Sequence, residues 1–402
     1  MTEPMVLTGA RVVAPDAVLD DGAVLVADGR IAAVLDGGLP RGGAGWGFDR
    51  DLQAVLAGAR RVDLAGGYLI PGLIDLHVHG AATASYDGGA EAIAAAVAAH
   101  RRHGTTGTLV SLITADPDDM VTAIRGAVAA AGDDPRILGI HLEGPFLAES
   151  RRGAHDPGKL LAPDGAVLQR FLDAGAGLVR MVTVAPELPG GLGLVHALVD
   201  AGVHAAVGHS DAGYRDAAAA FAAGADIVTH AFNGMRPLHH RDPGIIAAAM
   251  DAGALLEVIN DGVHLHDATV RLLQAIAPGR LALVTDAMAA AGAPDGHYLL
   301  GSLAVQVVGG IARLASDGAE PGSIAGSTLT MDVALRRAVL DVQLDVVDAV
   351  NAASLVPARF LGVADRVGAV ITGRTADLVI VDDAWQIRAV LTGGDWSDER
   401  RP

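Results

Sequence analysis

The strongest constraint on the fold is an alternation that runs through the middle of the chain. Eight short apolar segments with strand character are separated by alanine-rich stretches with helical character. A parallel sheet needs such crossovers between its strands, and eight strand-helix units predict a closed (β/α)8 barrel of the TIM type. An open doubly wound sheet is the alternative, but no G-x-G-x-x-G turn follows an early strand. The segments are 69–76, 107–112, 137–142, 178–184, 204–208, 227–229, 254–259 and 281–285.

Both ends of the chain have β character instead. Short strand-like segments occupy 6–13, 22–31, 376–381 and 387–391, and Asp28-Gly29 is a typical hairpin turn. The two ends are therefore expected to build one small β-sandwich domain together.

This expectation divides the chain into two domains. Residues 1–66 plus 367–402 are assigned to the small β-domain, and residues 67–366 to the barrel. The segment 39–58 is rich in glycine and arginine, and it is predicted to be a loop or insertion with no assigned role.

Composition excludes several classes of function. The chain has 402 residues, of which 51% are hydrophobic and 19% charged, so it suits a globular barrel with an accessory domain. No segment reads as a transmembrane helix or a secretion signal, and cysteine is absent, so we expect a cytoplasmic protein without thiolate ligands. A net charge of -18 without a basic stripe disfavours nucleic acid, but it permits a small anionic substrate.

Polar residues follow six of the eight predicted strands. In a barrel these positions converge at the C-terminal face, where active sites are built. His77 and His79 are one residue apart and therefore share one face of their strand. Histidine and carboxylate side chains at one mouth are suited to binding a divalent metal. The residues are His77, His79, His141, Glu143, His209, His230, His264 and Asp286.

Two ligand sets are plausible within this group. Glu143, His209 and His230 form the first, and His77 with His79 forms the second, sharing Glu143 or a carboxylate after the last strand. Zn, Fe, Co or Mn would suit either set, with one or two ions per subunit.

Asp286, after the last strand, is the carboxylate that could complete the second set. Beside a metal-bound water it is predicted to act as general base and then as general acid. Lys159, the only lysine, lies in a predicted loop, so a carbamylated lysine is not expected to bridge two metals, and Glu143 is the natural substitute.

Five segments of the chain together resemble the N-acetylglucosamine-6-phosphate deacetylase family of the amidohydrolase superfamily. They occur in the family's order and span nearly the whole chain. The resemblance implies hydrolysis of the N-acetyl amide of N-acetylglucosamine 6-phosphate to give acetate and glucosamine 6-phosphate. The His-Leu-Glu-Gly-Pro-Phe and Thr-Asp-Ala-Met sequences are specific to this family, whereas His-x-His occurs throughout the superfamily. The segments are 71–80, 141–146, 208–212, 229–235 and 284–288.

The resemblance also implies roles for individual residues. Glu143, His209 and His230 are implied as metal ligands, and Asp286 as the acid/base. Arg241 is implied to reach the substrate phosphate from the neighbouring subunit, in a homodimer or a dimer-based tetramer. The implied substrate-binding residues are Ala154, His155, Asn233, Gly234, Arg241, Asp261, His264, Ile324, Ala325 and Gly326.

Three points stay open on the sequence alone. Some family members lack the His-x-His pair and use one metal, whereas this chain has both His77 and His79, so the metal count is undecided. Another amidohydrolase, of the D-aminoacylase or cyclic amidase type, is the alternative activity. A catalytically inactive relative is disfavoured, because every implied ligand is present.

Overall fold

The computed structural model describes residues 3–37, 50–316 and 322–397. These residues fall into two compact units, which we describe separately. One comprises Met1–Ile74, Arg101–Thr106 and Leu335–Pro402, and the other Asp75–His100 and Gly107–Ala334. Within the described residues, no helix combines the length and the apolar character needed to cross a bilayer.

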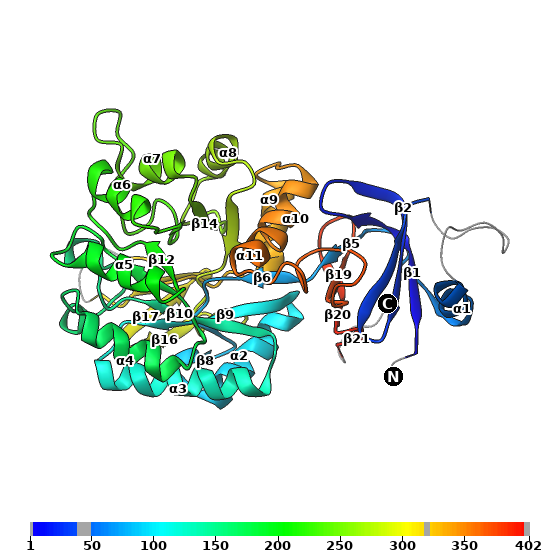
Figure 1. Cartoon of the computed structure of the whole chain (residues 1–402), viewed down its shortest axis with the longest axis horizontal. Helices are drawn as coiled ribbons and strands as arrows, with labels where there is room; N and C mark the ends of the chain where they lie inside the picture. The colour runs from blue at the N-terminus through cyan, green and yellow to red at the C-terminus, as the bar shows by residue number, and fades with distance from the viewer. Residues whose placement is uncertain (1–2, 38–49, 317–321, 398–402) are drawn as a thin grey trace. The chain divides into compact units, whose positions relative to one another are not determined.

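The larger unit contains most of an eight-stranded sheet whose strands lie side by side in chain order (Figure 1). Its strands are largely buried, as expected for a parallel sheet covered on both faces. Val78 and Ala287 form a parallel bridge that joins the first and last strands of the order. The predicted (β/α)8 barrel is confirmed. The strands are β6 (Leu73–Asp75), β9 (Thr105–Ile113), β10 (Ile137–Glu143), β11 (Val179–Val184), β12 (His204–Val207), β13 (Ile227–Val228), β14 (Leu255–Ile259) and β15 (Leu281–Val284).

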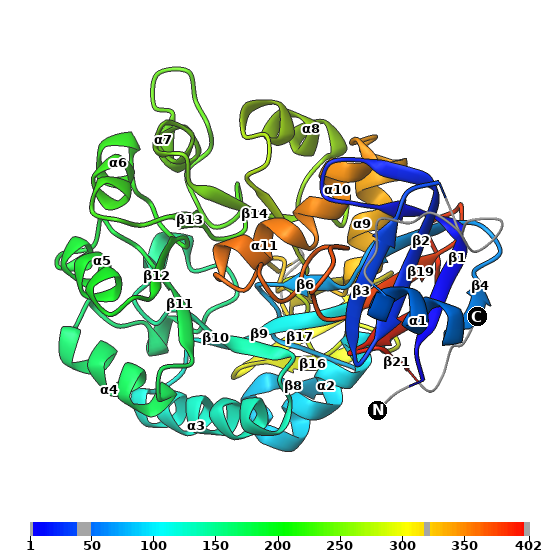
Figure 2. The same ribbon diagram turned by 45° about the vertical axis from the view of Figure 1, so that its right-hand side comes forward.

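Amphipathic helices connect these strands and lie around their outside (Figures 1 and 2). Helix α4 is an example: Asp164 caps its first turn, while Leu168 and Phe171 are buried. The helices are α2 (Ala90–Arg102), α3 (Pro117–Asp133), α4 (Gly165–Gly175), α5 (Gly191–Asp200), α6 (Tyr214–Ala222), α7 (Gly244–Ala252) and α8 (Asp267–Ile276).

Shorter elements lie between and after them. They are the strands β7 (Gly80–Ala81) and β8 (Ala84–Ser85), the 3-10 helices η1 (Tyr86–Gly88), η2 (Glu149–Arg151) and η3 (Pro157–Lys159), and the helices α9 (Met331–Leu340), α10 (Val346–Ala352) and α11 (Leu355–Phe360).

The smaller unit contains a sheet made from both ends of the chain, as predicted (Figure 2). Asp28 and Gly29 form the predicted hairpin turn, and both have positive φ. Val6 and Leu7 are neighbours in β1 but belong to different apolar clusters, because successive side chains of a strand point to opposite faces of the sheet. The strand order is β21 (Asp395–Trp396), β20 (Ile387–Thr392), β19 (Leu378–Val381), β5 (Tyr68–Pro71), β1 (Met5–Val13), β2 (Val18–Ala27) and β3 (Arg30–Leu35), with β4 (Arg60–Asp63) paired to β1.

The predicted first barrel strand, 69–76, is divided between the two sheets. Its first half is β5, which pairs with β1 and β19 in the terminal sheet, and its second half is β6 of the barrel. Gly72 separates them and donates its N–H to the carbonyl of Asp377. A Cβ at Gly72 would lie 2.0 Å from the Thr106 hydroxyl oxygen, so this close approach requires glycine.

One other expectation is corrected, and one element is new. The segment 39–58 was predicted to be a loop, but its last part forms helix α1 (Arg50–Gly58), because Val55 and Leu56 can pack against the cluster that contains Val6. Residues 39–49 lie outside the described part. A three-stranded sheet was not predicted: β16 (Gly296–Leu300), β17 (Leu303–Val308) and β18 (Ile311–Leu314).

Gly208 tests how tightly the barrel mouth is packed. A Cβ there would lie 2.5 Å from Thr229 Cβ and 2.9 Å from Thr183 Cγ2. We expect Gly208→Ala to destabilise the protein by about 1–3 kcal/mol, because the barrel must shift to admit the methyl group. Gly132→Ala, in an exposed turn of α3 with open space around it, is the control and should be neutral or stabilising. Midpoints of urea unfolding measure both, and equal midpoints would contradict this packing.

Candidate metal and substrate site

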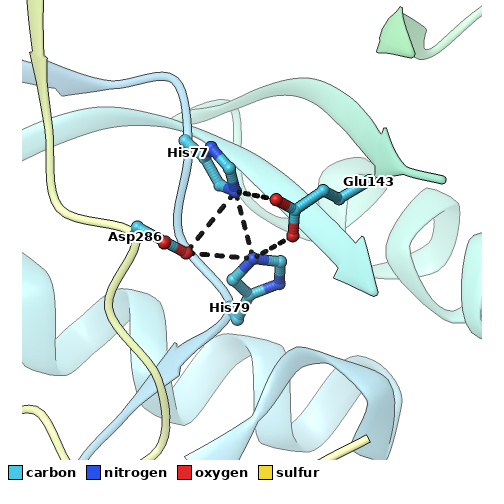
Figure 3. Close-up of side chains that lie close together, drawn as sticks. All are labelled: His77, His79, Glu143 and Asp286. Carbon is cyan, nitrogen blue, oxygen red and sulfur yellow. Dashed lines mark hydrogen bonds and ion pairs between the residues drawn. The ribbon is translucent and has the colours of Figure 1, made fainter. Parts of the chain in front are cut away.

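Histidine and carboxylate side chains converge at one mouth of the barrel. Four of them are drawn in Figure 3: His77 and His79 after β6, Glu143 at the end of β10, and Asp286 after β15. His79 Nε2 lies 3.1 Å from Glu143 Oε2 and 3.3 Å from Asp286 Oδ1. His77 Nε2 lies 3.5 Å from both Glu143 Oε1 and Asp286 Oδ1. These four residues could hold a metal ion together.

Glu143 is the residue that this group shares with the other predicted ligands. Its Oε1 atom lies 2.9 Å from His209 Nε2 and 3.1 Å from His230 Nε2. Its Oε2 atom faces His79 and, at 3.5 Å, His155 Nε2. The carboxylate therefore stands between both predicted ligand sets, as a bridging ligand would.

The hydrogen bonds of the histidines fix their tautomers. His79 Nδ1 lies 3.2 Å from the carbonyl oxygen of Ser111, and His209 Nδ1 lies 2.8 Å from that of Arg151. A carbonyl oxygen only accepts, so each Nδ1 carries the hydrogen. The Nε2 atom of each ring then faces the centre of the site, where it would ligate a cation.

The Nε2 atoms of four histidines lie close together in pairs. The Nε2 atoms of His77 and His79 are 3.1 Å apart, and those of His209 and His230 are 2.9 Å apart. Facing lone pairs repel each other unless a proton or a cation lies between them. Imidazole and carboxylate donors in this arrangement fit a divalent metal ion of the borderline type.

Three of the site residues have strained backbones. Asp286 has φ 48°, His209 has φ 46° and His230 has φ 28°, and each directly or closely follows a barrel strand. Non-glycine residues in this region are uncommon and cluster at functional sites. The strain turns each side chain from its strand toward the mouth.

Electrostatics set the protonation of two further groups. Burial alone would raise the pKa of Asp286, but the His77 charge and the His79 hydrogen bond outweigh it and lower this pKa to about 2. Asp286 is therefore ionised near neutral pH and able to accept a proton. Burial, followed by the nearby His209, lowers the pKa of His155 to about 4, so His155 is neutral there.

Most of the implied substrate-binding residues line the same pocket as the proposed metal ligands. Ile113 and Leu300, which the sequence did not single out, add apolar walls to it. The pocket also contains His79, Glu143, His209, His230 and Asp286. The implied substrate-binding residues that line it are Ala154, His155, Asn233, Gly234, His264, Ile324 and Gly326.

Three implied substrate-binding residues are not among those lining the pocket. Asp261 accepts hydrogen bonds from Nδ1 and the backbone N–H of His264, at 2.7 and 2.8 Å. Ala325 is buried in the cluster that contains Leu300. Arg241 is exposed in the segment between β13 and α7.

Glu257, in β14, was missed by the sequence analysis. It is fully buried, and its Oε2 lies 3.0 Å from His77 Nδ1 and 3.0 Å from the backbone nitrogen of His230. A single charge inside the apolar segment 254–259 was the signal that could have identified it.

This fold and ligand cluster define a hydrolase of the amidohydrolase class. The chain matches the Amidohydrolase family over residues 68–396, and it belongs to that family. Within it, the chain is similar to deacetylases of amino-sugar phosphates.

Two relatives and one structure show this similarity. The chain is 34% identical to an N-acetylgalactosamine-6-phosphate deacetylase of Escherichia coli O157:H7, over 97% of this chain and 98% of that protein. It is 35% identical to the N-acetylglucosamine-6-phosphate deacetylase of Bos taurus, over 85% and 86%. The D267A mutant of the Mycobacterium smegmatis N-acetyl-D-glucosamine-6-phosphate deacetylase, solved with N-acetyl-D-glucosamine-6-phosphate, is 38% identical with a TM-score of 0.89, covering 98% of this chain and 99% of that chain.

Proposed function

We propose that this protein hydrolyses N-acetylglucosamine 6-phosphate to glucosamine 6-phosphate and acetate. One observation carries the proposal: Asp286, the histidine-carboxylate cluster and most of the implied sugar-binding residues line the same pocket. The names of the similar proteins support the same substrate class. Neither a D-aminoacylase nor a cyclic amidase is favoured by these similarities.

The proposed ligands form two cation sites. Glu143, His209 and His230 would hold the tighter ion, and His77 with His79 would hold a second, sharing Glu143 or Asp286. A bound Zn, Fe, Co or Mn ion would supply acidification of a water molecule and polarisation of the acetyl carbonyl. The described residues fit this chemistry: His77, His79, Glu143 and Asp286 lie close enough to share an ion, and Glu143 Oε1 lies near Nε2 of both His209 and His230.

Asp286 is proposed to move the proton. As an ionised carboxylate it accepts a proton at its side-chain oxygen, and it returns that proton to the departing amine. His155 is proposed to contact the acetyl group, and its position in the pocket beside Glu143 supports this role.

The other proposed contacts bind the sugar phosphate. Asn233 and Gly234 would contact it near the phosphate, and His264 with its partner Asp261 would contact the sugar. Ala154 and the loop that contains Ile324, Ala325 and Gly326 would line the sugar pocket.

Arg241 is proposed to reach the phosphate of a neighbouring subunit's substrate, in a homodimer or dimer-based tetramer. Its exposure away from its own pocket supports action in trans. The cytoplasmic location expected from the sequence stays a prediction, as do the proposed domain boundaries.

A release assay for acetate tests the proposed activity. N-acetylglucosamine 6-phosphate should be hydrolysed much faster than unphosphorylated N-acetylglucosamine. N-acetylgalactosamine 6-phosphate belongs in the same assay, because a relative aligned over nearly the whole chain bears that name. Faster release from an unphosphorylated N-acyl amino acid, or from a cyclic amide, would contradict the proposal.

Asp286→Asn should retain the fold and bound metal but lose most turnover. Its amide neither accepts the proton well nor returns it to the amine, and general acid/base roles contribute about 10²–10⁴-fold in rate. Steady-state kinetics with metal analysis measure this, with the exposed Asp200→Asn as control. Near-normal turnover with metal in place would show that Asp286 is not the acid/base.

Arg241→Ala should raise KM for the phosphorylated substrate far more than for the free sugar. A charge-assisted contact with phosphate is lost, whereas the sugar contacts remain. Arg215→Ala, at an exposed position of α6, is the control. Mixing Arg241→Ala with Asp286→Asn should restore some activity, because mixed dimers contain one complete site. Equal losses on both substrates would reject the phosphate role, and no rescue after confirmed subunit exchange would reject action in trans.

Joint substitution of His77→Asn and His79→Asn should remove one of two bound metals and only part of the activity. The site formed by Glu143, His209 and His230 keeps its dedicated ligands and should stay filled. Elemental analysis of protein purified with excess metal provides the count. The exposed pair His196→Asn and His297→Asn is the matched control. One ion per subunit in both the parent and the variant would identify a single-metal enzyme.

A further inference from the structure

Glu257 is a charged residue in an environment that favours apolar side chains. Its neighbours along β14 are leucine, valine and isoleucine, and the whole strand is buried. In the described part of the chain, Glu257 and Glu143 are the two buried glutamates. A buried carboxylate is costly unless it is paired or serves a cation, so Glu257 requires a specific explanation.

One oxygen of Glu257 contacts both predicted metal sets. Oε2 lies 3.0 Å from His77 Nδ1, on one set, and 3.0 Å from the backbone nitrogen of His230, on the other. The two contacts are different in kind. The imidazole of His77 is held directly, whereas His230 is held through its main chain and its ring remains independent of Glu257.

The contact with His77 fixes how this ring faces the site. Glu257 Oε2 accepts the hydrogen bond from His77 Nδ1, and this contact directs Nε2 of the ring to the site. That Nε2 atom is the one near His79, Glu143 and Asp286. A carboxylate behind a ligating imidazole orients the ring and increases its basicity.

We propose that Glu257 is a positioning residue that confers cation affinity on the His77/His79 site. The proposal rests on the proposed metal sites, and it adds that the second site depends on a carboxylate which does not touch the ion. The Glu143/His209/His230 site is expected to depend on it far less, because only a backbone contact reaches that site.

Cobalt binding to the full-length protein tests this dependence. Metal-stripped parent, Glu257→Gln and the exposed control Glu91→Gln are titrated with Co²⁺, followed by visible absorption and calorimetry. The parent and the control should bind two equivalents. In Glu257→Gln the second equivalent should weaken by about 10–100-fold, as for other residues behind a metal ligand, while the first keeps its affinity.

A double-mutant cycle separates positioning from a general structural effect. If Glu257 acts through His77, adding Glu257→Gln to His77→Asn should cause no further loss of the second equivalent. Parental affinity for both equivalents in Glu257→Gln, equal weakening of both, or additive losses would each overturn the proposal.

Two further measurements keep the test decisive. If circular dichroism shows that Glu257→Gln is unfolded, Glu257→Asp replaces it. The shorter side chain keeps the charge but moves the carboxylate oxygen away from His77. Parental Co²⁺ binding by that variant would also overturn the proposal. The parent's deacetylation assay is independent of this titration, so failure of the proposed activity and failure of the positioning role are distinguished.

Discussion

The architecture of the site depends on one carboxylate, that of Glu143. Both of its oxygens face imidazole nitrogens: Oε1 lies near His209 and His230, and Oε2 lies near His79. Glu143 is the last residue of β10, so the register of that strand determines where its carboxylate lies. The pairing of β10 with its two neighbours sets that position, because Glu143 lies opposite Ile113 of β9 and Thr183 of β11, and a slip of one residue would turn its side chain to the other face.

Around this carboxylate, main-chain groups do much of the positioning. Carbonyl oxygens of Ser111 and Arg151 hold the rings of His79 and His209, and the N–H of Asp286 donates to the carbonyl of His77. These acceptors are main-chain groups, so the fold itself holds the Nδ1–H of each ring. His77 differs, because its Nδ1 lies beside the carboxylate of Glu257, a side chain that a substitution can change.

The sequence predicted the barrel and its mouth well, for a physical reason. Buried parallel strands are apolar throughout, so a histidine or carboxylate at a strand end, as at Glu143 or His209, is conspicuous. The boundary between β5 and β6 at Gly72 was harder to predict. The apolar sequence continues across it, and only the pairing partners show that the two halves belong to different sheets. The role of Glu257 depends on contacts with residues 180 and 27 positions away, which no local pattern contains.

The division of that strand has a consequence for synthesis of the protein. Strand β5 pairs with β1 on one side and with β19, more than three hundred residues later, on the other. While the ribosome is still translating the barrel, β5 has an open edge able to pair with another chain. The terminal sheet is completed only after β19 and β20 have been synthesised. Until then, the open edge of β5 is expected to make the nascent chain prone to pairing with other chains.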